Sequence, residues 1–456
     1  MEPVIVPGAF LCKERERTCP ISDAVGAAQL FYRGDMGFRR QMEKPVMTGG
    51  KHRRGLAVTA ALLGGVLTLS ACGGGDDGDD TEKSATKNDI SAEKDSSSAR
   101  IKISAEDGAD NASINTGGNV TVTGGKLTKV SLKAVQSGAT IEGSLGSDGK
   151  SWKPGKQLER ATKYEISATA KDGEGRKAVE NRTFTTVAPE HSFIGTYVGQ
   201  DGSTVGVGMP VSITFDKQIQ NKKAVQSAIK VSSSSGQEVV GHWFGNDRLD
   251  FRPEDYWQPN TKVTLDLGLD GVKAGNGNVG VQDKKVTFNI GRKQVSTVDV
   301  KSYKMKVERD GKVVKTIPIS AGSAKNPTYN GQMVISEKHK ETRMDGNTVG
   351  FGRKGAEGYD IPDVPHAMRL STSGTFIHGN YWGAPFGSGN TSHGCVGLKD
   401  TRGAGSTSTD AGWFYENSMI GDVVVVKGSP DKTIQPDNGL NGWNMNWSEW
   451  KAGSAV

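Results

Sequence analysis

The chain has 456 residues, of which 62 are glycine, 34% are hydrophobic and 24% are charged. This composition argues against one large apolar core and favours two to four small, loop-rich β domains. The formal net charge is +6, but residues 1–71 carry +4 of it. The remainder is therefore close to neutral, and we expect no nucleic-acid partner.

The N-terminal part of the chain has the pattern of a leader. Residues 47–71 open with Met47 and the basic stretch KHRR, and they continue with an apolar stretch that is too short for a good spanning helix. This order is typical of a secretory signal peptide. With residues 1–46 included, the basic region would be unusually long. We therefore expect translation to begin near Met47 and interpret residues 1–46 as a mis-assigned upstream extension.

The leader ends in Leu-Ser-Ala-Cys, which resembles a bacterial lipobox with Cys72 as its cysteine. The motif implies cleavage before Cys72 and lipid on its sulfur. We therefore expect a lipoprotein anchored to the outer face of the cell membrane, in the cell wall, with residues 72–99 as a disordered tether. The alternative is an ordinary signal peptide with a fortuitous cysteine. Because Cys12 and Cys19 lie in the leader, Cys395 would remain as a lone thiol in a non-reducing compartment.

Two segments after the tether predict β-sandwiches. Residues 100–187 contain short alternating runs such as NVTVTGGKLTKVSLKA, separated by turn signals. Residues 188–292 repeat this style, and Val211, Ile213 and Phe215 alternate with polar residues in one run. Strands of this length and spacing are typical of β-sandwiches. These segments hold no cluster of His, Cys or paired acids, so we expect them to act as a spacer.

Residues 293–428 predict a third, mainly β domain. The run KMKVERDGKVVKTIPIS is a hairpin signal with its turn at Asp310-Gly311. One short helix is expected over AGWFYENSMI with Asp410 as its cap, followed by a buried terminal strand, GDVVVVKGS. Residues 429–456 contain three tryptophans spaced by four and three, and we expect this segment to pack on the preceding domain.

The chemistry of the chain concentrates in FIHGNYWGAPFGSGNTSHGCVGLKD. A cysteine nucleophile needs a base, a group that orients the base, and donors for the developing oxyanion. His378 follows an apolar strand and can be held rigidly. Gly394 permits a sharp turn, after which the amides of His393, Gly394 and Cys395 can form an oxyanion nest. His339 and His366 are expected at the surface or in loops.

This stretch resembles the L,D-transpeptidase (YkuD-type) family, whose signature is a His, a loop, and Ser/Thr-His-Gly-Cys. The runs NPTYNGQMVISEK, STSGTFIHG and GWNMNWSEWKAG resemble the actinobacterial lipoprotein members, which carry two immunoglobulin-like domains before the catalytic domain. The resemblance implies that Cys395 attacks the peptide stem of peptidoglycan between diaminopimelate and D-alanine. A second stem then resolves the thioester, giving a 3→3 cross-link, with His378 as proton acceptor and then donor. Residues 293–428 would be the catalytic domain, and no cofactor is expected.

The resemblance also implies roles for further residues. The carbonyl of Gly379 would orient His378, at a position where some relatives have Ser. Ser392 would position the turn, and the backbone of His393 would matter more than its ring. The donor site would be lined by Tyr359, Ser373 and Gly374, with Met344 in the lid. Position 397 departs from the family, because it is Gly397 where many relatives have Asn or Arg near the substrate.

The family is generally sensitive to carbapenems, so the resemblance implies that these β-lactams acylate Cys395 as covalent inhibitors. A histidine that lowered the pKa of the thiol below its free value of about 8.5 would give a substantial thiolate fraction at neutral pH.

Three other functions fit parts of the sequence. An L,D-carboxypeptidase would use the same thioester with water as the acceptor. A non-catalytic wall-binding lipoprotein could keep the fold without the reaction. A zinc site could use His378, His393 and Cys395, but their spacing fits no common zinc pattern and no acidic residue lies nearby as a base.

Overall fold

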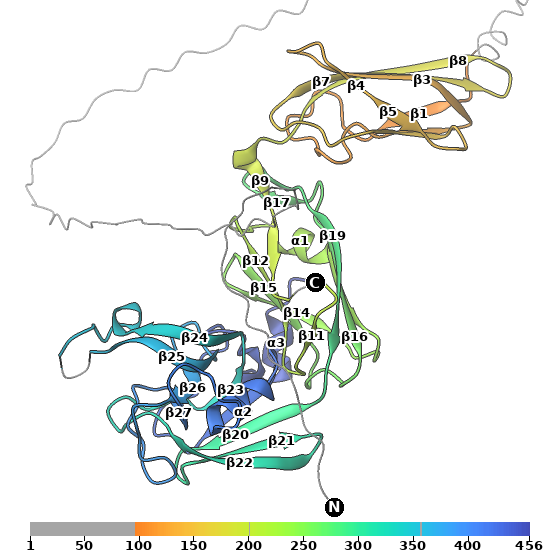
Figure 1. Cartoon of the computed structure of the whole chain (residues 1–456). Coiled ribbons are helices and arrows are strands. Elements are labelled where there is room, and N and C mark those ends of the chain that lie inside the picture. Colours follow the sequence, from red (N-terminus) through yellow and green to blue (C-terminus); the bar gives the residue numbers. More distant parts are fainter. Residues whose placement is uncertain (1–95, 200, 356–357) are drawn as a thin grey trace, which may run out of the picture. The chain divides into compact units, whose positions relative to one another are not determined.

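The computed structural model describes residues 96–199, 201–355 and 358–456 (Figure 1). The expected signal peptide, the expected lipidation site at Cys72 and most of the expected tether lie outside these residues. No helix among the described residues has the length and apolar character needed to cross a membrane.

The first domain consists of two four-stranded sheets. Its core holds Trp152, Tyr164 and Phe184, which the alternation of the strands turns to the inside. One sheet contains β1 (Arg100–Ile103), β2 (Val120–Thr123), β6 (Ser151–Pro154) and β5 (Gly143–Leu145). The other contains β4 (Thr140–Ile141), β3 (Gly125–Ala134), β7 (Lys163–Asp172) and β8 (Lys177–Thr185).

The second domain is also built from facing sheets. The expected alternation is confirmed, because Val211, Ile213 and Phe215 all lie in its core. One sheet contains β10 (Gly195–Tyr197), β12 (Val211–Phe215), β15 (Arg248–Arg252) and β14 (Val240–Phe244). The second contains β11 (Thr204–Val205), β19 (Asp283–Ile290), β16 (Lys262–Gly268) and β13 (Ile229–Ser233). Smaller elements are η1 (Pro189–His191), β9 (Ser192–Phe193), α1 (Lys222–Ser227), β17 (Lys273–Gly275) and β18 (Asn278–Gly280).

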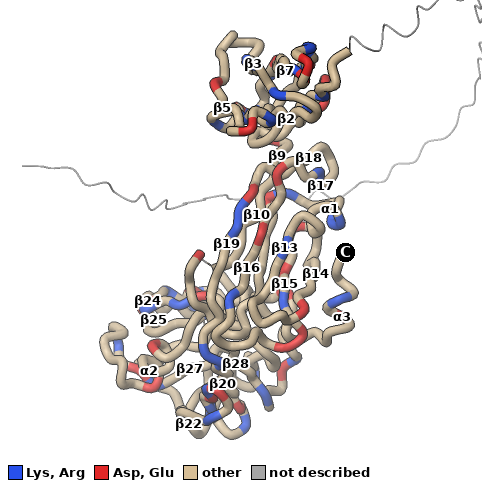
Figure 2. Tube along the Cα trace, turned by 90° about the vertical axis from the view of Figure 1, so that its right-hand side faces the viewer, with Lys and Arg blue, Asp and Glu red and all other residues tan. Residues whose placement is uncertain are grey.

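Charges on this domain are mixed in sign. Figure 2 shows Lys and Arg interspersed with Asp and Glu along strands such as β19 and β16. This is the distribution of a solvated surface.

The third domain is a single curled sheet of nine strands. In sheet order these are β23 (Gly331–Val334), β28 (Val423–Lys427), β20 (Gln294–Asp299), β21 (Lys304–Arg309), β22 (Lys312–Ser320), β27 (Val396–Lys399), β26 (Phe376–Asn380), β25 (Asp360–Arg369) and β24 (Glu337–Asp345). The Asp310-Gly311 hairpin is confirmed, since β21 pairs with β22 and both turn residues have positive φ.

The expected helix of this domain forms as α2 (Asp410–Glu416), but its cap differs from the prediction. The side chain of Thr409 accepts a hydrogen bond from the amide of Gly412, so Thr409 is the N-cap and Asp410 is the first helical residue. Thr and Asp both favour this region of a helix, and the sequence alone did not separate them. The remaining 3₁₀ turn within the domain is η2 (Gly346–Val349).

The C-terminal segment, with η3 (Gly442–Asn444) and α3 (Trp447–Ala452), contacts two domains. Asn441 joins it to the nine-stranded sheet, because its side chain accepts a hydrogen bond from the amide of Val334 at 3.0 Å. Its tryptophans reach the second sandwich: the indole of Trp443 donates to the carbonyl of Gly208, and that of Trp450 donates to Val240. We expected this segment on the catalytic domain, and the structure adds the second sandwich to its contacts.

Candidate active site

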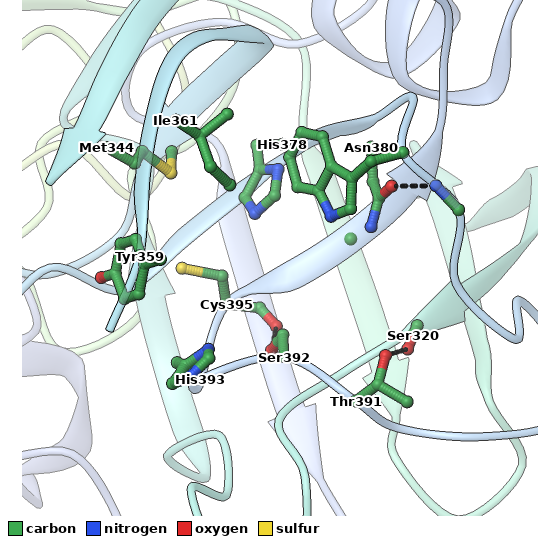
Figure 3. A pocket seen from close by; sticks show the side chains of 13 residues that line it. Ser320, Met344, Tyr359, Ile361, His378, Asn380, Thr391, Ser392, His393 and Cys395 are labelled. Carbon is green, nitrogen blue, oxygen red and sulfur yellow. Dashed lines mark hydrogen bonds between the residues drawn. The ribbon is translucent and has the colours of Figure 1, made fainter. Parts of the chain in front are cut away.

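The pairing of β26 with β27 brings His378 and Cys395 to one face of the sheet. The two strands are parallel, with Ile377 opposite Val396 and His378 opposite Gly397. Side chains alternate between the faces of a strand, so Cys395, two positions before Gly397, shares the face of His378. Both side chains line one cavity, in which the imidazole lies beside the thiol (Figure 3). The glycine opposite His378 leaves that face open.

The thiol of Cys395 lies in surroundings that disfavour its charged form. Its sulfur is 3.6 Å from the carbonyl oxygen of Gly374, and its side chain packs against a buried cluster of Val364, Ala367 and Phe376. Burial raises the pKa of Cys395 to about 11. The thiolate expected at neutral pH is therefore not the resting state, and the proton must leave as the nucleophile attacks.

His378 is buried, and its tautomer follows from one hydrogen bond. Its Nδ1 is 2.8 Å from the carbonyl oxygen of Gly379. Because a carbonyl only accepts, Nδ1 carries the proton and Nε2 is left with a lone pair when the ring is neutral. Burial lowers the pKa of His378, which keeps the ring neutral at pH 7. His378 is thus arranged as a proton acceptor.

A tight turn precedes Cys395. The Ser392 hydroxyl donates to the carbonyl oxygen of Cys395 and accepts from the amide of Gly394 at 3.1 Å. Gly394 has φ of 114°, which favours glycine. The three-amide oxyanion nest expected from the sequence loses one member, because the Gly394 amide is already bonded to Ser392. The amide of Cys395 itself is the candidate donor that remains nearest the sulfur.

The ring of His393 packs among aromatic side chains. Its centroid lies 5.1 Å from that of Phe351 and 5.1 Å from that of Tyr359. Burial raises the pKa of Tyr359 to about 12, with the nearby Cys395 contributing. These contacts give the imidazole of His393 a packing role at the wall of the site.

Two cavities meet at Cys395. The first has a volume of about 260 Å³ and contains most of the residues predicted from the sequence. These are Met344, Tyr359, His378, Ser392, His393, Cys395 and Gly397. The second, of about 340 Å³, is lined by Ser373 and Gly374 and again by Tyr359 and Cys395. The structure therefore brings the predicted catalytic and substrate-binding residues, all of which are described, into or beside one connected region.

Sequence reasoning missed several side chains of the first cavity, among them those of Trp382 and Asn380. Trp382 is 44% exposed and stacks on His378 with centroids 5.9 Å apart. Asn380 lines the same cavity and holds the loop after β26, accepting from the amide of Gly383 at 2.9 Å. Asn380 and Trp382 follow His378 within four positions of the sequence. The aromatic residue four positions after the histidine was the one sequence feature that could have indicated them.

The expectation for His366 was wrong. Its side chain is buried, 1% exposed, and its Nδ1 lies 2.7 Å from a carboxylate oxygen of Asp400. Its φ is +47°, a value that is uncommon for a residue within a strand. His339, in contrast, is partly exposed on β24 and pairs with Glu337. Within the described residues, no three His, Cys, Asp or Glu side chains are grouped as metal ligands.

Known proteins match the chain in both of its halves. Residues 293–426 match the profile of the L,D-transpeptidase catalytic domain, and residues 109–273 match a bacterial Ig domain. L,D-transpeptidase 2 of Mycobacterium tuberculosis is 33% identical over 402 residues, which covers 88% of this chain and 94% of that protein. L,D-transpeptidase 5 of the same species is 31% identical, covering 70% of this chain and 69% of that protein.

Solved structures give a partial match. The structure of LD transpeptidase LdtMt1 in complex with imipenem aligns with a TM-score of 0.43 and 26% identity, covering 51% of this chain and 97% of that chain.

The curled sheet and the sequence matches together define an enzyme with a YkuD catalytic domain preceded by immunoglobulin-like sandwiches. The chain belongs to the L,D-transpeptidase family, as its relation to L,D-transpeptidase 2 shows. The resemblance drawn from the sequence and the mainly β fold are thereby confirmed.

Proposed function

We propose that this L,D-transpeptidase forms 3→3 cross-links in peptidoglycan through a thioester on Cys395. The proposal is supported above all by one observation: a neutral His378, its Nδ1 proton held by Gly379, shares a sheet face and a cavity with the only cysteine of the described residues. A neutral thiol beside a neutral imidazole can react if the proton moves as the sulfur attacks.

The first half-reaction consumes the donor stem. His378 Nε2 takes the thiol proton while the sulfur of Cys395 bonds to the carbonyl carbon of diaminopimelate. The carbonyl electrons move to oxygen, where backbone amides of the turn stabilise the charge. When the tetrahedral intermediate collapses, the bond to D-alanine breaks, and the imidazolium returns its proton to the leaving amine. A thioester remains on Cys395.

The second half-reaction uses the side-chain amine of a second stem. This amine attacks the thioester, His378 accepts one of its protons, and the sulfur leaves to be reprotonated. We assign the donor stem to the cavity with Ser373 and Gly374, with Tyr359 at its wall and Met344 over it. Gly397, opposite His378, leaves room for the acceptor, where a larger residue would stand in the cavity.

We further propose that the enzyme works at the outer face of the cell membrane, anchored by lipid on Cys72. The leader pattern of residues 47–71 and the following polar stretch support this location. The intact mass of membrane-extracted protein tests it: we expect a chain that starts at Cys72 and carries acyl groups. An unmodified N-terminus elsewhere would refute the anchor.

The activity is tested with a purified disaccharide-tetrapeptide as both donor and acceptor. We expect a dimer whose mass equals two monomers less one D-alanine, and fragmentation that places the bond between two diaminopimelate residues. Cys395→Ala should give no product. A tripeptide product without dimer would assign the L,D-carboxypeptidase reaction instead. Unchanged substrate with the folded native protein would contradict both reactions.

A further inference from the structure

A buried hydrogen-bonded pair lies directly behind the site, and neither of its residues takes part in the proposed reaction. His366 of β25 and Asp400, just after β27, have side chains that are 1% and 0% exposed. The His366 Nδ1 is 2.7 Å from Asp400 Oδ2. Burying a carboxylate costs free energy unless it is well paired, so this arrangement needs an explanation.

The second oxygen of Asp400 ties the pair to the helix. Asp400 Oδ1 accepts from the hydroxyl of Thr409 and from the amide of Thr401, both at 2.8 Å. Thr409 is the residue that caps α2. Since both oxygens of the carboxylate are bonded, its position is fixed between β25, the end of β27 and α2.

The fixed carboxylate touches the segment that holds His378. A Cβ placed on Gly379 would lie 2.0 Å from Asp400 Oδ2, so the carboxylate packs directly against the glycine Cα. The carbonyl of Gly379 is the group that receives the Nδ1 proton of His378. This contact explains why glycine stands at position 379: with Asp400 in place, no side chain fits.

We propose that Asp400, held by His366, is a positioning residue for His378: it fixes the Gly379 carbonyl behind the imidazole and supplies a negative charge for the imidazolium that forms during thiol attack. The inference rests on the proposed function of His378 as the proton acceptor. The proposal also accounts for the positive φ of His366, because a strained backbone conformation persists only where the surrounding structure requires it.

The charge of Asp400 raises the pKa of His378, as expected of a group that stabilises the imidazolium. Burial lowers the pKa of His378, whereas the Gly379 carbonyl and the Asp400 charge both raise it. The other titratable groups around the imidazole are the thiol of Cys395, the His393 ring and the Tyr359 phenol, all from the walls of the cavity. Removing the Asp400 charge should therefore lower the pKa of His378 further.

The test measures single-turnover acylation of Cys395 by a carbapenem across the pH range, by intact mass. Asp400→Asn keeps the shape of the side chain and removes its charge. We expect its maximal rate to fall about 10–100-fold, as for a misplaced catalytic group, with little change in the half-saturating concentration. The acidic limb of its pH profile should move to lower pH. His366→Asn, which tolerates a positive φ, keeps the Asp400 charge and removes one hydrogen-bond partner of its carboxylate. It should lower the rate less and leave the acidic limb nearly in place.

The matched control is Asp422→Asn, which removes another buried carboxylate, paired with Arg292 at 3.0 Å and remote from His378. It should lower thermal stability and leave the pH profile in place. A positioning role is overturned if Asp400→Asn keeps the native rate and profile, or if it loses rate with an unmoved acidic limb, as a general structural defect would.

A steric variant keeps the proposal falsifiable should Asp400→Asn fail to fold. Gly379→Ala keeps the Asp400 charge and places a methyl group against its carboxylate, so it should reduce acylation strongly. A native acylation rate in folded Gly379→Ala would contradict the contact. His378→Ala separates a failure of the proposed mechanism from a failure of the positioning role. If His378→Ala is acylated at the native rate, the proposed mechanism fails. If His378→Ala is inactive while Asp400→Asn is unaffected, only the positioning role of Asp400 is overturned.

Discussion

At the scale of single residues, the site combines two groups that are both uncharged at neutral pH. Burial raises the pKa of the Cys395 thiol to about 11 and lowers that of the His378 imidazole. A preformed thiolate–imidazolium pair would require both shifts to have the opposite direction. We therefore expect proton transfer to accompany attack.

The rate of alkylation of Cys395 by iodoacetamide tests these directions. Because the thiolate is the nucleophile and the thiol pKa is about 11, we expect slow alkylation at pH 7 and a steady rise through the alkaline range. The measurement is the loss of free thiol with time at each pH. A rate that reaches a plateau below pH 8 would show a stable thiolate and contradict the neutral pair.

The two histidines near Cys395 should differ in importance. His378→Ala removes the proton acceptor, and general base catalysis is worth about 10²–10⁴-fold. His393→Ala removes a ring that packs on Phe351 and Tyr359, while its backbone stays. We expect the larger loss of acylation rate at His378, measured by stopped-flow with thermal unfolding as the control for folding. Equal losses in two folded variants would reverse the roles.

At the scale of elements, the turn before Cys395 depends on one backbone conformation. Gly394 has φ of 114°, and a side chain there is strained by about 1–3 kcal/mol. Gly394→Ala should therefore shift the amide of Cys395 and lower the acylation rate more than it lowers global stability. Rate and urea unfolding are measured on the same preparation. A variant with native rate would show that the turn geometry does not position the nucleophile.

Most helices and strands could be predicted from the local sequence pattern. The remaining features depend on contacts between residues that are far apart in the sequence. The Asp310-Gly311 hairpin and the alternating strand Val211–Phe215 could be predicted because turn chemistry and period-two burial are local properties. His378 and Cys395 could be placed in one site from their motif. The pairing of His366 with Asp400 could not, because it depends on a left-handed strand residue and on partners 34 positions apart.

At the scale of the whole molecule, the second sandwich shares its hydrophobic core with residues of the catalytic domain and the C-terminal segment. Val334, Leu440 and Trp443 lie in the same hydrophobic cluster as the core of the sandwich. Arg252 of the sandwich lies over the ring of Trp450, 4.3 Å from its centroid. The second sandwich and the catalytic domain are therefore joined by packing, and the expectation that the sandwiches act as a spacer stays a prediction.

Truncation tests this shared core. A fragment of residues 188–456 should unfold in one transition near that of the chain with both sandwiches, whereas residues 293–456 expose Trp443 and Trp450 and should be markedly less stable. Burying such side chains is typically worth about 3–5 kcal/mol each. Calorimetry of both fragments gives the comparison. Equal melting temperatures would show that the catalytic domain is stable alone.

The central claim, that Cys395 carries the acyl group, is tested most directly by carbapenem capture. A carbapenem has a strained acyl carbonyl, and ring opening leaves an acyl group on the attacking atom. We expect intact mass spectrometry to show one adduct per chain, and peptide mapping to place it on Cys395. Cys395→Ala should remain unmodified, and a chelator should have no effect. An adduct on a serine, or none on the folded native protein, would contradict the account.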